Sequence, residues 1–497
     1  MEWWMVSTLA VGILVFSAIQ AHPQCGPICR CENGSPERGR SRRRRRPLAR
    51  RLVPVLVVAF AVLPLAGCVG YRAANTALEQ YDPAHGYRPT DRRQHRDSGK
   101  IIILLAFSGG GTRAAAFAYG VLEGLRETQI AVDGIEVSLL EEVDSISGVS
   151  GGSFPAAYYG LFGDRIFEDF EARFLKKNVQ RALLFRALRP WNLLRLFTPW
   201  LSRSDLASGY YNDKIFDGAT YADLARAKGP LIRINATDLS SGDRFTFSQT
   251  TFDIICSDSD VFPISTAVAA SSAVPMLLSP ITLKNHAGSC GYDPPEWAKE
   301  AIENRHTDPR RNRSAESFLK LSDAERKKYI HLVDGGISDN LALRPAIEFV
   351  SAVGGIEKAR QIVGVEMPDH LVVIAVNAET DPDPKIDLTA ASPSFASLMS
   401  SVSGSQIRRY NFETLLLVGD MVRGWGRDLS TDDHPVTSHM VYVGFDKVED
   451  PEERQYLKWL PTSFFLKDLE VDRLREAGRR LLLDSPDFQE LLQALKE

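Results

Sequence analysis

The chain has 497 residues, a formal net charge of −4, and a composition that is 44% hydrophobic and 25% charged. These values are typical of an ordinary globular protein and exclude a disordered or fibrous chain. Residues 1–68 carry ten Arg and three Glu, a net charge of +7, which leaves −11 on the remaining residues. An acidic body of this kind argues against a nucleic-acid partner.

The first 68 residues have the features of an export signal. A basic run at 37–51 is followed by an apolar run that ends at Cys68. The stretch LAGC at 65–68 resembles a bacterial lipobox, in which the cysteine receives lipid and becomes the mature N-terminus. The expected location is therefore outside the cytoplasm. Val69 and not Asp follows the cysteine, so in a Gram-negative source the expected location is the outer membrane, facing the periplasm.

Other interpretations of the N-terminus stay open. Residues 53–70 could form an uncleaved transmembrane anchor, because about 17 apolar residues can just span a bilayer. An earlier apolar run at 3–19 has no Lys or Arg before it, so an upstream extension of the reading frame and a first membrane segment both fit. Residues 69–99 are polar and are predicted to form a tether.

The cysteines agree with export. Cleavage at the lipobox would leave Cys68 for lipid and only Cys256 and Cys290 in the body. These two could pair in an oxidising compartment, and two buried thiols fit equally well. The cysteines at 25, 29 and 31 lack the paired C-x2-C spacing of zinc sites, so no metal is predicted.

From residue 100 onward the pattern is that of an α/β protein. Short apolar runs alternate with helical stretches, which predicts a three-layer α/β/α fold with a mostly parallel central sheet. Residues 100–350 are expected to form the main domain, and residues 351–497 to complete or flank it. Strands are predicted at 101–107, 142–147, 230–236, 329–333 and 371–377.

Three consecutive glycines, Gly109, Gly110 and Gly111, separate the first predicted strand from a helix. Without Cβ atoms their N–H groups can approach a ligand closely, and the following helix N-terminus favours negative charge. One possible ligand is a dinucleotide, since Gly109, Gly111 and Ala114 spell G-x-G-x-x-A, with Asp133 placed for a ribose contact. The other is a transient oxyanion.

The second predicted strand ends in G-x-S-x-G, formed by Gly148, Ser150 and Gly152. Such a strand-to-helix turn presents the serine Oγ at the carboxyl end of the sheet. Because a serine hydroxyl is a weak nucleophile at neutral pH, a base must lie within hydrogen-bond reach. Asp334 follows the strand at 329–333 and precedes two glycines, so its carboxylate could face the same crevice, although Asp-Gly is also a common turn dipeptide.

The stretches GGGTR, GVSGG and DGG, in this order, resemble the patatin-like phospholipase family. Two more stretches match it, INATDLSSGDRFTFS and AASSAVPMLLSPI, and DGGISDNLALRP carries the expected Asn340 and Pro345. The resemblance covers about residues 100–350. It favours the oxyanion over the dinucleotide, because a dinucleotide fold gives no reason for the serine and aspartate motifs.

The resemblance implies a lipid acyl hydrolase with a Ser-Asp dyad and no catalytic histidine. Ser150 would be the nucleophile and Asp334 the base, and the substrate would be a phospholipid or another acyl ester at a membrane surface. Neither a cofactor nor a metal is implied. Arg113 would position the loop or contact an anionic headgroup. The implied oxyanion hole consists of Gly109, Gly110, Gly111 and Gly151.

Two rival functions come from other classes. His434 or His439 could complete a Ser-Asp-His triad of the α/β-hydrolase type, because the chain order is the same. Alternatively, a protein with a blocked pocket could bind lipid without catalysis.

An aromatic and cationic stretch lies between the serine and the next strand. Apolar residues recur there at helix-like intervals between arginines: Phe185, Leu188, Trp191, Leu194, Phe197 and Trp200. This pattern suits a surface in lipid headgroups or a lid over an acyl pocket. Core packing is the commoner origin of such a stripe and is the expectation here.

Overall fold

The computed structural model describes residues 73–89 and 98–496, except for 133, 197, 199–200, 276, 382–385, 389 and 391. The predicted signal, lipobox and Cys68 lie outside the described residues, as do Asp133, Phe197 and Trp200. No helix in the described part of the chain is long and apolar enough to cross a membrane.

Within these residues the central sheet has eight strands in the order β12-β11-β2-β5-β6-β10-β9, with β7 paired to β6. Five strands are mutually parallel: β12 (Thr437–Gly444), β11 (His370–Asn377), β2 (Ile101–Phe107), β5 (Val143–Val149) and β6 (Leu231–Asp238). Three are antiparallel to their neighbours: β10 (Tyr329–Val333), β9 (Ile281–Lys284) and β7 (Arg244–Phe247). The five predicted strands are all present, and the mostly parallel sheet is confirmed.

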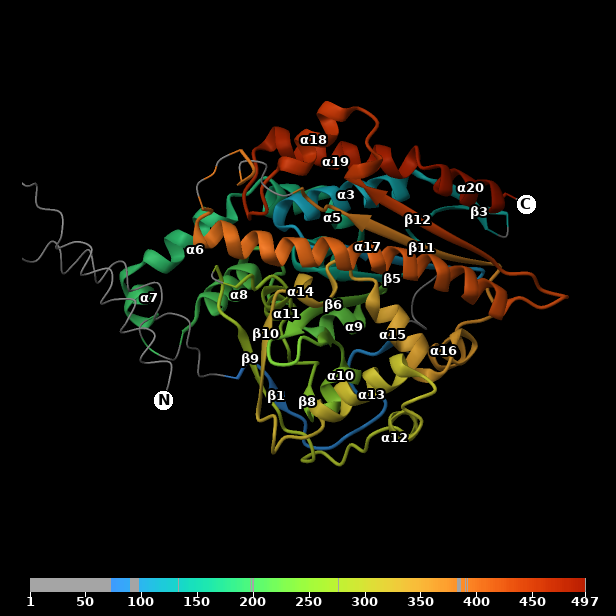
Figure 1. Ribbon diagram of the computed structural model, residues 1–497, viewed down its shortest axis with the longest axis horizontal. Helices are drawn as coiled ribbons and strands as arrows, with labels where there is room; N and C mark the ends of the chain where they lie inside the picture. The colour runs from blue at the N-terminus through green and yellow to red at the C-terminus, as the bar shows by residue number, and fades with distance from the viewer. Residues whose placement is uncertain are drawn as a thin grey trace, which may run out of the picture. The chain divides into compact units, whose positions relative to one another are not determined.

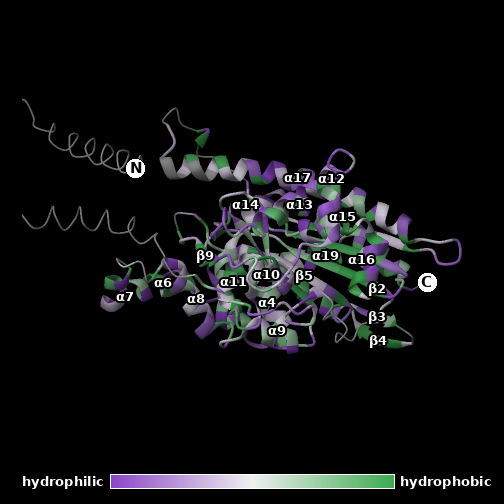
Figure 2. Ribbon diagram, turned by 90° about the horizontal axis from the view of Figure 1, so that it is seen from below, coloured by the Kyte–Doolittle hydropathy of each residue, from purple (hydrophilic) through white to green (hydrophobic). Residues whose placement is uncertain are grey.

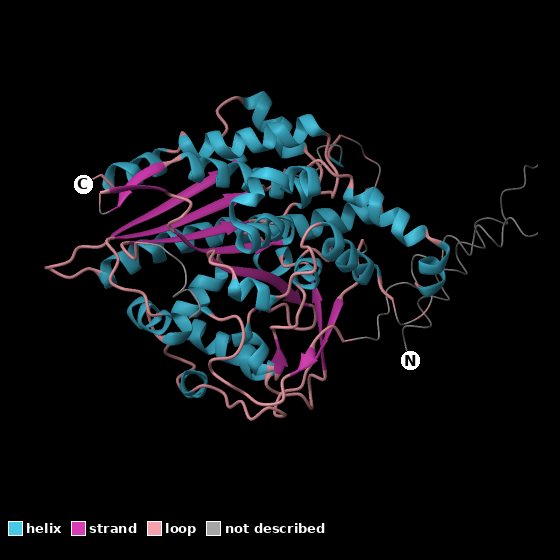
Figure 3. Cartoon of the chain, turned by 180° about the vertical axis from the view of Figure 1, so that it is seen from behind, coloured by secondary structure: helices cyan, strands magenta, loops and turns pink. Residues whose placement is uncertain are grey.

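Helices cover both faces of this sheet, as Figures 1 and 3 show. On one face, side chains of β2 pack with α3 (Gly111–Glu127), α4 (Ser153–Phe162) and α19 (Asp468–Leu483). On the other face, β11 packs with α15 (Arg344–Val353) and α17 (Phe395–Leu429). The predicted three-layer α/β/α fold is therefore confirmed.

The C-terminal region contributes to the same core. Its strands β11 and β12 extend the sheet beyond β2, and its helix α19 lies along α3 (Figure 1). The two helices approach closely because glycines face backbone: a Cβ on Gly120 would lie 1.9 Å from Arg475 O, and a Cβ on Gly478 would lie 2.2 Å from Phe117 O. Residues 100–350 thus share one hydrophobic core with the residues that follow.

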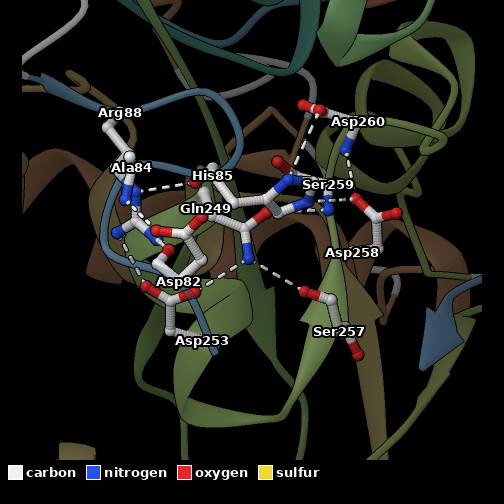
Figure 4. Close-up of polar contacts among 10 residues, drawn as sticks. All are labelled: Asp82, Ala84, His85, Arg88, Gln249, Asp253, Ser257, Asp258, Ser259 and Asp260. Carbon is white, nitrogen blue, oxygen red and sulfur yellow. Dashed lines mark hydrogen bonds and ion pairs between the residues drawn. The ribbon is translucent and has the colours of Figure 1, made fainter. Parts of the chain in front are cut away.

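Residues 73–89 are packed on the body, which corrects the expectation of a free tether there. Strand β1 (Thr76–Ala77) pairs with β8 (Ser257–Asp258), and the Tyr87 hydroxyl accepts a hydrogen bond from the Ile232 N–H at 2.6 Å. Figure 4 shows the polar contacts that hold the segment, including a buried ion pair of 2.7 Å between Arg88 Nη1 and Asp253 Oδ2.

Cys256 and Cys290 form a disulfide, with Cα atoms 5.5 Å apart and a sequence separation of 34. The sulfur atoms are buried, and Leu78 of the N-terminal segment packs against them. Of the two possibilities open from the sequence, the structure has the disulfide.

Candidate active site

Ser150 sits in a tight turn between β5 and α4. Its φ is +50°, a left-handed conformation that is unusual for a residue with a side chain. The glycines beside it have no room for a Cβ: one on Gly151 would lie 2.0 Å from Gly111 O, and one on Gly152 would lie 2.6 Å from Phe107 O. The serine turn is therefore packed directly against the end of β2 and the glycine turn.

The Ser150 hydroxyl donates a hydrogen bond of 2.7 Å to Asp334 Oδ2. Both residues are buried. Their strands, β5 and β10, are not neighbours, because β6 lies between them. The structure thus brings together the two residues predicted to react.

Asp334 reaches this position along an unexpected path. Strand β10 is antiparallel to β6 and pairs with it only over Leu332 and Val333, opposite the last residues of β6. Strand β10 therefore runs toward the carboxyl edge of the parallel strands from beyond that edge, and its own carboxyl end, followed by Asp334, lies there.

Hydrogen bonds fix the Asp334 carboxylate and its backbone. Oδ1 accepts from the Gly336 N–H at 2.8 Å, and the Asp334 carbonyl accepts from Thr237 Oγ1 at 2.8 Å. Burial nevertheless raises the pKa of Asp334 to about 6, and the hydrogen bonds from Ser150 and Gly336 oppose this shift. The carboxylate is a stronger base than an ordinary aspartate.

Ser271 supports the serine turn and was missed as a site residue from the sequence. It ends α11 (Ile264–Ser271). Its Oγ accepts from the Ser150 N–H at 2.9 Å and donates to the Asn235 carbonyl at 2.6 Å. The stretch around it contributed to the family resemblance, but no local pattern distinguishes this serine from its neighbour Ser272.

The three glycines lie beside the nucleophile. A Cβ on Gly109 would be 3.3 Å from the Ser150 Cβ. The Gly109 N–H donates to the Asn340 carbonyl at 3.0 Å, so this glycine shapes the turn and does not offer a free donor. Gly110 and Gly111 have φ values of +143° and +61°, and their N–H groups have no partner among the described residues.

The family model described as "Patatin-like phospholipase" matches residues 105–347. This chain contains a patatin-like phospholipase domain. The matched residues include both motifs of the Ser150–Asp334 pair and the glycine turn.

The similarities to solved structures are weaker. Human GIVD cytosolic phospholipase A2 is 12% identical, with a TM-score of 0.40 over 86% of this chain and 68% of that chain. Its complex with methyl gamma-linolenyl fluorophosphonate gives 14% identity and a TM-score of 0.35, over 82% of this chain and 61% of that chain. These scores support no functional argument.

A curated relative matches a short part of the chain. "Protein fmp52, mitochondrial" from Aspergillus fumigatus is 35% identical over 86 residues, which are 17% of this chain. The chain spans only 37% of that protein's length.

Arg113 of the patatin-like domain is buried in the first turn of α3. Its Nε donates to the Ala378 carbonyl at 3.0 Å and its Nη1 to the Leu460 carbonyl at 2.7 Å. Burial lowers its pKa to about 10. These contacts join the glycine turn to the C-terminal region, which favours loop positioning over contact with a headgroup.

Neither candidate histidine of a triad lies near the patatin-like dyad. His439 lies in register with Val372 of β11 and Ile103 of β2. Ile103 is about 13 Å along the strand from Phe107, and Phe107 pairs with Gly148, which adjoins the serine turn. His434 precedes β12 and contacts the Pro368 carbonyl at 3.1 Å. Both therefore lie toward the amino end of the strands, and the triad alternative is not supported.

One group of described residues could hold a metal ion: His85, Asp258 and Asp260. His85 Nε2 lies 2.9 Å from Asp258 Oδ1, and its Nδ1 lies 3.8 Å from Asp260 Oδ2. Since each ring nitrogen faces a carboxylate, the group acts as a polar clamp on residues 73–89 (Figure 4). It is not part of the Ser150 site.

A cavity of about 390 Å³ lies at the carboxyl ends of β11 and β12, beside α17. Its lining includes Asn377, Glu379, Arg408, Tyr442 and Lys458. Strand β2 separates these strands from β5, and neither Ser150 nor Asp334 lines the cavity. The cavity is therefore separate from the dyad.

Proposed function

We propose that this protein is a lipid acyl hydrolase that cleaves carboxylic esters through an acyl-enzyme on Ser150. The observation that carries the proposal is the 2.7 Å hydrogen bond from Ser150 Oγ to the buried Asp334 carboxylate. The patatin-like domain and the adjacent glycine turn supply the other expected parts.

In the first half-reaction, Ser150 Oγ forms a bond to the ester carbonyl carbon while Asp334 takes the hydroxyl proton. The oxygen of the tetrahedral intermediate accepts hydrogen bonds from the Gly110 and Gly111 N–H groups, and Gly151 packs against Gly111. The bond to the leaving alcohol then breaks, and Asp334 returns the proton to that alcohol.

In the second half-reaction, water attacks the acyl carbonyl and Asp334 takes one of its protons. The bond to Ser150 Oγ breaks, the fatty acid leaves, and the proton returns to Ser150. With a pKa of about 6, Asp334 is mostly ionised at neutral pH and still a useful base.

For the location, we propose export with lipid on Cys68, which anchors the enzyme at the outer membrane facing the periplasm. The basic run, apolar run and LAGC stretch support this. The disulfide agrees with an oxidising compartment. An N-terminal transmembrane anchor would show instead as a full-length protein that keeps residues 1–67 and carries no lipid.

The direct test is hydrolysis of a soluble medium-chain ester and of phospholipid by the full chain. Ser150→Ala is expected to lower turnover at least about 10³-fold, because the nucleophile is lost. The matched control is Ser272→Ala, which removes an equally buried hydroxyl bonded to the Val268 carbonyl. Turnover that survives Ser150→Ala contradicts the mechanism, and a wild type silent on every ester supports a lipid-binding role instead.

A further inference from the structure

Two helices leave an apolar face in solvent next to the site. They are α6 (Val179–Leu188) and α7 (Pro190–Arg195), which project from the body in Figures 1 and 2. The exposed fractions are 57% for Leu184, 56% for Phe185, 46% for Leu188, 71% for Trp191 and 64% for Leu194. This corrects the expectation of core packing for the described members of the stripe.

Helix α6 also has a separate buried side. Val179 is fully buried, and Ala182 and Leu183 pack against the main core. The residues at 184, 185 and 188 lie on another side of the same helix. The helix is thus apolar on two faces, and only one of them has a partner in the described part of the chain.

The stretch of chain that carries this face is cationic, and of its arginines Arg186 pairs with Asp213 of α8 (Arg203–Lys214). Residues 176–203 include seven Lys and Arg and no Asp or Glu. Three exposed arginines, Arg181, Arg189 and Arg195, have no carboxylate within salt-bridge distance among the described residues. Exposed apolar side chains with interleaved arginines match the interface of an anionic bilayer, where the former enter the acyl boundary and the latter meet headgroups.

The same face is joined to the proposed active site through one loop. The Phe464 carbonyl accepts from the Gln180 N–H, at the start of α6, at 3.3 Å. The preceding residue, Ser463, accepts through its carbonyl from the Thr112 N–H at 2.9 Å. Thr112 follows the glycine turn directly. A membrane held against α6 and α7 would therefore lie beside the edge of the sheet that holds the dyad.

The chain also enters the body near this face. The Ala74 N–H donates to the Thr282 carbonyl at 2.9 Å, and Ser204, in the first turn of α8 (Arg203–Lys214), bonds to the carbonyl of nearby Ser279. Helix α8 follows α7 in the sequence. The six residue-to-residue steps from Cys68 to Ala74 span at most about 20 Å, so lipid on Cys68 would bring this end to a bilayer.

We propose that α6 and α7 form the surface by which the enzyme docks on an anionic phospholipid bilayer, with Trp191 and its apolar neighbours inserted. We name Leu184, Phe185, Leu188, Trp191 and Leu194 the docking face. The proposal rests on the proposed lipid hydrolase and adds the way in which the site meets its substrate.

The test is co-flotation of the full chain, in a Cys68→Ser background, with vesicles of phosphatidylcholine alone or with phosphatidylglycerol added. The quantity compared is the extra binding that phosphatidylglycerol produces, because apolar residues upstream of Cys68 could bind both vesicles. Leu188→Asp/Trp191→Asp is expected to lower this extra binding at least about tenfold. Arg181→Gln/Arg189→Gln/Arg195→Gln is expected to lower it about a hundredfold, at about fivefold per arginine.

The matched control is Ile362→Asp/Leu469→Asp, which places the same charge at two residues that are 51% and 63% exposed on other helices. It is expected to bind within twofold of wild type. Equal binding by the docking-face variant and wild type overturns the proposal, as does equal loss in the control. A dimer that the docking-face variant abolishes, without vesicle binding by wild type, would assign the face to self-association instead.

Hydrolysis of a soluble ester separates this proposal from the proposed function. All these variants are expected to keep wild-type turnover of a soluble ester, since none touches the dyad. A wild type that floats through the docking face but hydrolyses no ester would leave the docking surface intact and contradict the hydrolase.

Discussion

The Ser150–Asp334 site and the docking face are opposite in construction. At the site, the reacting side chains are buried and hydrogen-bonded, and the turns around them leave no space for a Cβ. On α6 and α7, large apolar side chains stand in solvent beside arginines that have no carboxylate partner among the described residues. The chemistry is therefore preorganised without lipid, and contact with lipid belongs to a different surface. Changes at the site should affect soluble and vesicle substrates alike, whereas changes on the docking face should affect only vesicles.

The largest effect is expected for Asp334→Asn, which should lower kcat/KM about 10³-fold or more on both substrates because the base is lost. The same change should stabilise the fold. Burial raises the folded-state pKa of Asp334 from the ordinary value of 3.8 to about 6, so the folded state holds more protons and stability falls as pH rises through this window. Removing that carboxylate should add up to about 3 kcal/mol at pH 8, measured by denaturant unfolding.

Asp339→Asn is the matched control. Asp339 is buried and has a pKa that burial raises to about 6, but it accepts from the Arg344 N–H and does not contact Ser150. We expect a comparable gain in stability with turnover within fivefold of wild type. If both variants lose turnover equally, the base assignment is wrong.

Arg113→Met should lower kcat about 10²-fold on both substrates, with KM little changed. Its loss leaves the Ala378 and Leu460 carbonyls without these hydrogen bonds and loosens the glycine turn. Loss of one oxyanion-hole donor lowers kcat by about this factor. Steady-state kinetics with Arg113→Lys as the partial rescue checks the positioning role. A change confined to KM on anionic lipid would instead indicate headgroup contact.

The pH profile of kcat/KM should fall tenfold per unit below about pH 6 and level off above it. Asp334 must be deprotonated to accept the Ser150 proton, and its pKa is about 6. The profile on the soluble ester should match that on vesicles after correction for binding. An acidic limb near pH 4, the ordinary range of aspartate, would contradict a buried base.

The smallest effect is expected for His434→Ala/His439→Ala, which should keep turnover within twofold on both substrates. Both residues lie toward the amino end of β12, away from the serine turn. Initial rates on the two substrates are sufficient to check this. A loss of more than a hundredfold would restore the Ser-Asp-His alternative.

Much of the sheet was predictable because parallel strands buried on both faces have continuous apolar sequences. Strand β2, for example, reads IIILLAF, with five residues buried and two partly buried. Strand β12 was missed because three of the first four residues, Thr437 to Met440, are polar and none of the four is buried. The direction of β10 was not predictable at all, since a strand's own sequence does not specify its neighbour.

The dyad was predictable because each member lies in a short motif with its own glycines. The residues that hold the dyad in place were not all predictable. Ser271 acts through a contact with a chain segment more than a hundred residues away, and no local pattern marks it, whereas Asn340 was expected from the family resemblance. The stripe at 185–194 was expected in the core because helical spacing shows that a face is apolar, but not whether another element covers it.

The central claim is that Ser150 is a nucleophile activated by Asp334, and labelling with an alkyl fluorophosphonate tests it most directly. In this reaction the serine oxygen bonds to phosphorus and fluoride leaves. Peptide mass spectrometry should find one adduct per chain, on Ser150, and Asp334→Asn should slow its formation about 10³-fold. An adduct on another residue, or labelling of Asp334→Asn at the wild-type rate, would contradict the account.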